Sequence, residues 1–84
     1  MYEVTSITTR TYDAGEGFYV DIVTDNQRME YGAWVYHESC GDKDFMFGVP
    51  FSQNSYEDFY NMVCRNLDMY VDDYKFWKME VDYD

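Results

Sequence analysis

A change of hydrophobic period near Ser55 constrains the fold of this chain more than any other feature. Before it, apolar and polar side chains alternate, as in strands with one buried face: Phe18, Val20 and Ile22 fall on one side of the clearest run. After it, apolar residues recur every three or four positions, which is the spacing of one helical face. They are Tyr56, Phe59, Tyr60, Val63, Leu67, Tyr70, Val71 and Tyr74. The pattern predicts a sheet followed by an amphipathic helix.

Residues 29–36 alternate in the same way and predict a hairpin with residues 18–23. A turn at Asn26-Gln27 would make one face of this hairpin continuously apolar and would place aromatic and acidic residues on the other. The expected pairs are Ile22 with Tyr31, Val20 with Ala33, Phe18 with Val35, and Tyr19 with Trp34. Asn-Gln is a weak turn pair, so a four-residue loop is equally compatible with the sequence.

The remaining segments complete an α+β fold. Residues 3–12 suit an edge strand because they are rich in threonine, and residues 45–49 suit a fourth strand that Pro50 ends. Ser55 and Asp58 predict the helix start, as an N-cap followed by an acid in the first turn. Beyond Asp73 the alternation of Trp77, Met79, Val81 and Tyr83 predicts a final strand. We expect one domain over residues 1–84, an antiparallel sheet of four to five strands with one helix on one face, in the order β-β-β-β-α-β.

Composition indicates that this scaffold carries a strong negative field. Seventeen Asp and Glu residues stand against six Lys and Arg, for a net charge of -11 on 84 residues, while 21% of the residues are aromatic. Disordered acidic tails lack aromatic residues, so the charge should belong to a folded body. Nucleic acids and anionic membranes are bound through Lys and Arg, so neither is expected as a direct partner. A charged partner should be a basic protein.

The sequence also bears on location and on the state of the cysteines. No apolar run approaches the roughly 20 residues that cross a bilayer, and the first residues lack the basic and apolar stretches of a secretion signal. We therefore expect a cytoplasmic protein, either a monomer or a small homo-oligomer. In that compartment Cys40 and Cys64 are expected as two thiols, although a single bridge remains open.

Reactive side chains do not form a recognisable catalytic or metal-binding pattern. His37 and Cys40 could form a nucleophile pair, but no third orienting residue accompanies them. Zinc bound by His37, Cys40 and Cys64 would lack the second close ligand pair that structural zinc sites normally have. We therefore predict a protein that is not an enzyme, with no catalytic residue, metal or cofactor. An enzyme that depends on Cys40 is the third functional hypothesis.

Acidic residues are predicted to cover the outer face of the helix and to extend onto the hairpin. At the helical rise per residue, Asp68 and Asp72 would lie about 6 Å apart along the axis, and Glu57 about 16 Å from Asp68. Carboxylates at such spacings can stand in for phosphates. The candidate partner-binding residues are Glu57, Asp58, Asp68, Asp72 and Asp73 on the helix, Asp21, Glu30 and Glu38 on the hairpin, and Tyr19, Trp34 and Tyr36 as aromatic anchors. An acidic surface that only maintains solubility is the simpler alternative.

In size, acidity, aromatic content and sheet-plus-helix outline, the whole chain resembles small phage-encoded inhibitors that mimic DNA, among them anti-CRISPR and anti-restriction proteins. The resemblance implies stoichiometric blockade of a host nuclease or DNA-binding complex, in the cytoplasm of the host cell, with carboxylates occupying its nucleic-acid channel. The second hypothesis is a small adaptor or accessory domain that binds another protein through the aromatic hairpin face, with the acids serving solubility.

Overall fold

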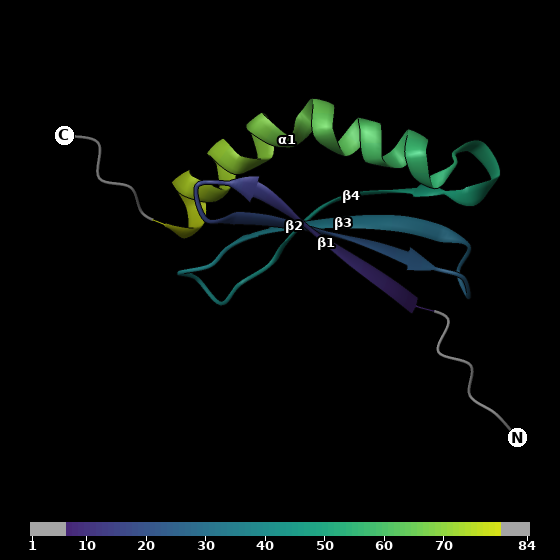
Figure 1. Ribbon diagram of the computed structural model, residues 1–84, viewed down its shortest axis with the longest axis horizontal. Coiled ribbons are helices and arrows are strands. Elements are labelled where there is room, and N and C mark those ends of the chain that lie inside the picture. The colour runs from purple at the N-terminus through teal and green to yellow at the C-terminus, as the bar shows by residue number, and fades with distance from the viewer. Residues whose placement is uncertain (1–6, 80–84) are drawn as a thin grey trace, which may run out of the picture.

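The computed structural model describes residues 7–79, which form four antiparallel strands followed by one long helix (Figure 1). The elements are β1 (Ile7–Gly15), β2 (Phe18–Asp25), β3 (Glu30–His37), β4 (Asp44–Pro50), a single 3-10 turn (Phe51–Gln53) and α1 (Tyr56–Lys78). The strands lie in the sheet in chain order, so each pairs with the next. The predicted α+β class, with one helix packed on the sheet, is confirmed.

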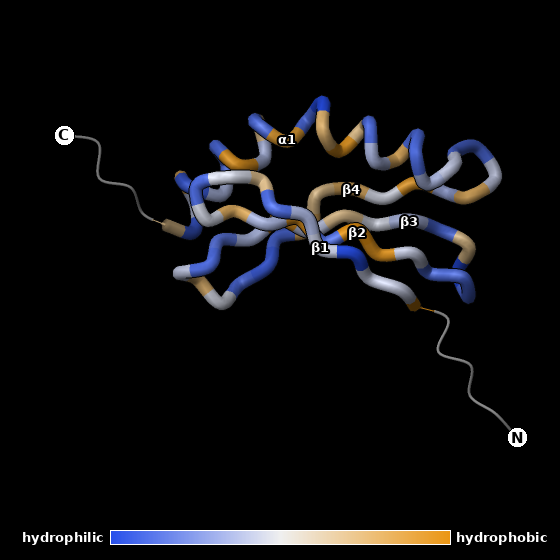
Figure 2. The backbone as a smooth tube through the Cα atoms, viewed as in Figure 1, coloured by the Kyte–Doolittle hydropathy of each residue, from blue (hydrophilic) through white to orange (hydrophobic). Residues whose placement is uncertain are grey.

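The core lies between α1 and the inner face of the sheet. Alternation places Phe18, Val20 and Ile22 of β2 on this face, as predicted, and each side chain is at most 3% exposed. The other buried apolar residues are Ala33, Val35, Met46, Phe59, Val63 and Tyr74. Figure 2 shows the hydrophobic positions of α1 recurring on the side that faces the sheet, with hydrophilic positions outside. The other face of the sheet carries no helix in the described part of the chain.

The β2–β3 hairpin has the predicted faces but a different register. Val20 pairs with Val35, and Tyr19 pairs with Tyr36 rather than Trp34, so the predicted pairing was wrong by two residues. The cause is the loop, which spans four residues between Asp25 and Glu30, so the four-residue alternative to an Asn26-Gln27 turn is the one observed. A shift of two keeps every side chain on its own face because the strand repeat is two. The Asp25 carboxylate holds the loop by accepting the backbone N–H groups of Gln27 and Arg28.

A bulge in β4 sorts its aromatic residues between the two faces. Gly32 pairs with Gly48 but Trp34 pairs with Phe45, so β4 carries one extra residue in this interval. As a result Phe47 reaches the core side, where its ring centroid lies 5.3 Å from that of Phe59. Phe45 lies instead against Trp34 on the outer face.

Helix α1 begins where the sequence predicted and ends later. Ser55 accepts the backbone N–H of Asp58, and the Asp58 carboxylate accepts the N–H of Ser55, which completes a capping box. The predicted strand beyond Asp73 was wrong as far as Lys78, because those residues are helical. Tyr74 explains the extension: its ring is fully buried and its hydroxyl donates to the Asp42 carbonyl at 2.6 Å, which fixes this turn on the sheet. Met79 follows as the C-cap of the helix and is not in a strand either. Residues 80–84 of the predicted strand, like residues 3–6 of the predicted N-terminal strand, lie outside the described residues.

The position of α1 on the sheet leaves one side of the inner face open. The helix backbone lies closest to β3 and β4. A helix about 10 Å wide covers roughly two strands at 4.8 Å spacing, so it cannot cover a four-stranded sheet. The side of β1 that faces α1 is therefore only partly covered.

Candidate protein-binding surfaces

The predicted acidic residues of the helix are exposed in two groups, one in the first turn and one at residues 68–73, about 15 Å apart along the axis. Glu57, Asp58, Asp68, Asp72 and Asp73 are all exposed, and we call this set the acidic row. None of them takes part in an ion pair within the described residues. Arg65 lies among these acids on the solvent-exposed side of α1. Asp58 also caps the helix, so one of its carboxylate oxygens is already used.

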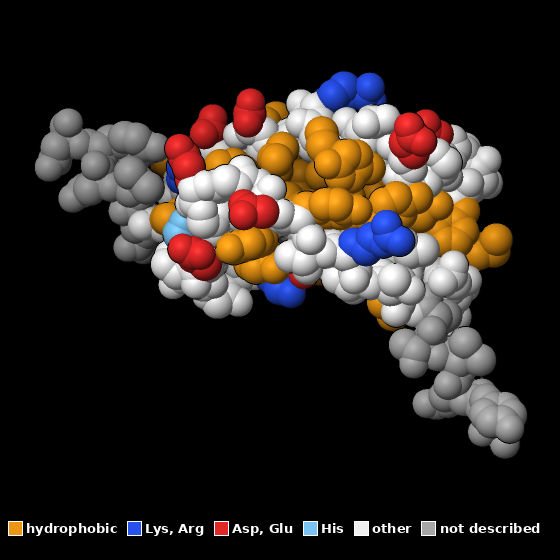
Figure 3. Space-filling model, in the orientation of Figure 1, with side chains coloured by type: hydrophobic (Ala, Val, Ile, Leu, Met, Phe, Trp, Pro, Cys, Tyr) orange, Lys and Arg blue, Asp and Glu red, His pale blue; other side chains and the backbone are white. Residues whose placement is uncertain are grey.

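An apolar groove runs between α1 and β1, below the acidic row. Its narrow middle section has a volume of about 60 Å³ and includes Tyr12, Tyr60, Cys64 and Leu67. Toward the start of the helix it widens to about 240 Å³ beside Tyr56. Figure 3 shows a band of hydrophobic side chains with acidic groups above it and, below it, acidic groups toward the left and a basic group toward the right. The sequence did not predict this groove, because it depends on where α1 lies across the sheet.

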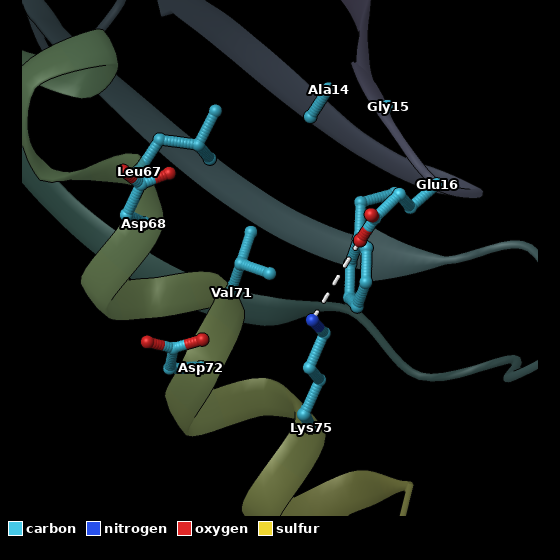
Figure 4. A pocket seen from close by; sticks show the side chains of 9 residues that line it. Ala14, Gly15, Glu16, Leu67, Asp68, Val71, Asp72 and Lys75 are labelled. Carbon is cyan, nitrogen blue, oxygen red and sulfur yellow. Dashed lines mark ion pairs between the residues drawn. The ribbon is translucent and has the colours of Figure 1, made fainter.

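The end of the groove near the β1–β2 turn is its largest section, at about 510 Å³. Leu67 and Val71 form its helix side, with Asp68 and Asp72 at the rim (Figure 4). Glu16 lies across the groove, 3.8 Å from the Lys75 Nζ. Three acidic residues and one basic residue thus line this end, and only Glu16 pairs with Lys75, which leaves this end with a net negative charge.

The predicted aromatic anchors lie on the opposite, outer face of the sheet. Tyr19 and Tyr36 stack with their ring centroids 5.7 Å apart, and Trp34 meets the edge of Phe45 at 5.0 Å. The Phe45 side chain is 54% exposed. Because α1 and this face are on different sides of the sheet, the structure does not bring the acidic row and the aromatic anchors together.

Asp21 lies among these aromatic residues and is buried rather than available to a partner. It is 4% exposed, and its carboxylate accepts the Lys43 Nζ at 2.8 Å and the Thr11 hydroxyl at 2.7 Å. The Tyr36 hydroxyl donates from 3.3 Å. Burial raises the pKa of Asp21, but these hydrogen bonds and the Lys43 charge outweigh it and hold the pKa below 3.8. The hydrogen bond to Asp21 raises the pKa of Lys43 in turn. Asp21 therefore forms a structural ion pair with Lys43.

Replacing Lys43 with methionine should destabilise the domain most at neutral pH. The pKa of Asp21 is lower in the folded state than the value of about 3.9 in the unfolded state. The Asp21 carboxylate therefore stabilises the fold above about pH 3.9, and this stabilisation is lost as the pH falls through the folded-state pKa. The difference in unfolding free energy between Lys43→Met and the wild type should therefore shrink between about pH 6 and pH 2.5, measured by urea unfolding. Lys78→Met breaks the more exposed pair with Asp44 and serves as the control, with a smaller loss at neutral pH. An equal loss at both pH values would contradict the assigned role of Asp21.

The two remaining acidic candidates lie apart from the acidic row. Glu30 opens β3 and is 4.0 Å from the Arg28 guanidinium, and Glu38 follows the other end of the same strand. Both are exposed, but they stand at opposite ends of the sheet. The structure therefore places the five helical acids on the exposed side of α1 and leaves Glu30 and Glu38 apart from them.

His37 and Cys40 lie close in the chain but do not form a hydrogen-bonded pair of side chains. The His37 Nδ1 accepts the Ser39 N–H at 3.1 Å, and its Nε2 lies 3.0 Å from the Glu16 carbonyl, so both ring nitrogens are occupied. Cys40 and Cys64 are not bridged. In residues 7–79 no three His, Cys, Asp or Glu side chains are grouped as a metal site requires.

Comparison with known proteins finds no matching family model, no similar curated protein and no similar solved structure. Within the described range, no helix has the length and apolar character to cross a bilayer. The surfaces themselves are thus the basis for a functional proposal.

Proposed function

We propose that this protein binds a basic, nucleic-acid-binding protein through the acidic row and blocks access of nucleic acid to it, without catalysing a reaction. The carboxylates of the row would occupy positions that phosphates take in the partner's own complex. Such a partner would be a nuclease or a complex of the restriction or CRISPR type.

The placement of the basic residues is the observation that supports this proposal. Of the six Lys and Arg residues, four form ion pairs with acids elsewhere. They are Arg28, Lys43, Lys75 and Lys78. Arg10 lies over the Tyr56 ring at 5.4 Å. Arg65 lies among the acids of the row, and Lys75, already paired with Glu16, lines the same end of the groove as Asp68 and Asp72. Two basic residues thus accompany five acids, so the row keeps most of its charge.

The spacing of the row limits what it can imitate. From Glu57 to Asp73 the helix rises about 24 Å, so five acids average about one charge per 5 Å, with a gap of about 15 Å between Asp58 and Asp68. A duplex carries one charge per 1.7 Å of axis and each strand one per 3.4 Å. The row therefore resembles a few phosphates of one strand, and the partner must recognise their positions in addition to their total charge.

Competition with DNA tests the proposal. The immobilised protein should capture a basic nucleic-acid-binding protein from a lysate of the cells in which it acts, at about 0.1 M salt. A short duplex should then release the captured protein, and so should about 0.5 M salt, because both compete for the same basic site. A captured protein that duplex DNA fails to release would refute mimicry.

The outer face supports a second candidate function. The exposed Phe45, with Trp34 and the Tyr19–Tyr36 stack, forms an aromatic surface that no described element covers. Tyrosine and tryptophan are frequent anchors of protein interfaces. An adaptor would use this face, and its partner would not be displaced by DNA.

A further inference from the structure

The apolar groove borders an edge of the sheet that is open in the described chain. No strand among residues 7–79 pairs with the outer side of β1, so alternate residues of β1 direct backbone N–H and C=O groups away from β2. From Ile7 to Asp13 this strand has neither a proline nor a bulge. The other edge strand, β4, contains a bulge and ends in Pro50. β1 is therefore the edge better able to accept a further strand.

We propose that β1 and the groove together bind an extended, basic segment of a partner protein, which adds to β1 as a fifth strand. This inference rests on the proposed function and specifies what the partner inserts. When a strand adds to a sheet edge, backbone hydrogen bonds provide affinity and pockets for alternate side chains provide specificity. Here the open edge of β1 offers the backbone hydrogen bonds, and the groove beside it offers the pockets.

The middle of the groove suits apolar side chains of such a strand. Tyr12 bridges β1 to the helix here, because its hydroxyl hydrogen-bonds with the Tyr56 hydroxyl at 2.8 Å and its ring centroid lies 5.1 Å from that of Tyr60. Residues that share a face of a strand lie about 7 Å apart, so those of an added strand that face α1 would pack against the outer side of this bridge and beside it. There they would meet Tyr12 of β1, and Tyr60 and Leu67 of α1. Aliphatic or aromatic residues are thus expected at these positions.

The two ends of the groove differ in charge and set the direction of the segment. At the turn end, the lining includes Glu16, Asp68 and Asp72 against the single Lys75, which is paired with Glu16, so Asp68 and Asp72 favour arginine or lysine. At the other end, Glu57 in the lining is balanced by Arg10 over the Tyr56 ring, so this end attracts a basic residue less than the turn end does. The segment should therefore have apolar residues at alternate positions, followed by basic residues at the end that lies beside Glu16.

A synthetic peptide with this pattern provides the test. The peptide alternates threonine with valine, phenylalanine, valine, arginine and arginine, in that order, and has blocked ends. Nuclear magnetic resonance titration of the full chain should show binding that shifts β1 amides and protects them from exchange. Two further peptides carry backbone N-methyl groups. In one peptide the methyl groups are on the residues whose N–H groups point to one edge of the peptide strand, and in the other they are on the alternate residues, whose N–H groups point to the opposite edge. We expect one of them to lose at least about tenfold in affinity and the other to bind as the parent does, because only one edge pairs with β1.

Matched variants of the protein test the charged rim. Asp68→Lys should weaken the peptide about fivefold or more, while Asp73→Lys, with the same charge change on the helix face away from the groove, should have less than about a twofold effect. Equal binding by both methylated peptides, or equal effects of the two variants, would refute strand addition and leave only general attraction between opposite charges. The proposed function would still hold after that result if duplex DNA released the captured partner. The two experiments therefore distinguish failure of this inference from failure of the proposed function.

Discussion

Phe59→Ala is expected to remove much or all of the stability of the domain. The Phe59 side chain is fully buried, and its ring lies 5.7 Å from the Tyr31 ring and 5.3 Å from the Phe47 ring. Phenylalanine-to-alanine changes in cores cost about 3 to 5 kcal/mol, because contacts are lost and a cavity remains. A domain of 84 residues has about 4 to 12 kcal/mol in total, so this one side chain accounts for a large fraction.

Urea unfolding followed by far-UV circular dichroism measures the loss. Phe45→Ala is the matched control, since the same side chain is removed from the exposed outer face, and it should cost less than about 1 kcal/mol. Similar losses for both variants would mean that the helix does not pack on the sheet through Phe59.

The double variant Asp68→Lys/Asp72→Lys is expected to weaken binding of the captured partner about 100-fold near 0.15 M salt. Each change removes an attraction to a basic site and adds a repulsion, which together amount to about tenfold per position. Both side chains are exposed and form no ion pair within residues 7–79, so the fold should be retained. Isothermal titration calorimetry with the purified partner measures the change, with circular dichroism as the check on folding.

Trp34→Ala separates mimicry from the adaptor function. If the acidic row binds the partner, removal of Trp34 from the outer face should change the affinity by less than about threefold, because the two surfaces lie on different sides of the sheet. The reverse result, a large loss with Trp34→Ala and little effect of the double variant, would establish the outer face as the binding surface. The double variant thus tests the proposed function, while the methylated peptides test only the strand addition.

Strand faces and the helix start could be predicted from the sequence because each depends on local chemistry. Alternation assigned Val20 and Ile22 to the core, and Ser55 with Asp58 marked the helix start. The hairpin register was missed by two residues because the hydrophobic pattern is the same after a shift of two, and only the loop length decides between such registers. The helix end was missed because Tyr74 is held by a contact with Asp42, which is distant in sequence.

The candidate surfaces were predicted only in part, for a similar reason. The acidic row follows from helical spacing alone, so its five residues could be named in advance. Asp21 alternates with the core residues of β2, and that position gave no sign that Lys43 would arrive from another loop to pair with it. The available signal was the position of this acid between Tyr19 and Val23 on one strand face. The groove could not be predicted, because it depends on the position of α1 across the sheet.

The loop before β4 links the two faces of the sheet. On the inner side the Tyr74 hydroxyl holds Asp42, and on the outer side the neighbouring Lys43 pairs with Asp21. If the last turns of α1 fray, the loop loses its inner attachment and Lys43 can move away from the carboxylate. Local opening of the helix end should therefore also release the loop before β4 and the Lys43–Asp21 pair, as one cooperative unit, even though the helix never touches the outer face.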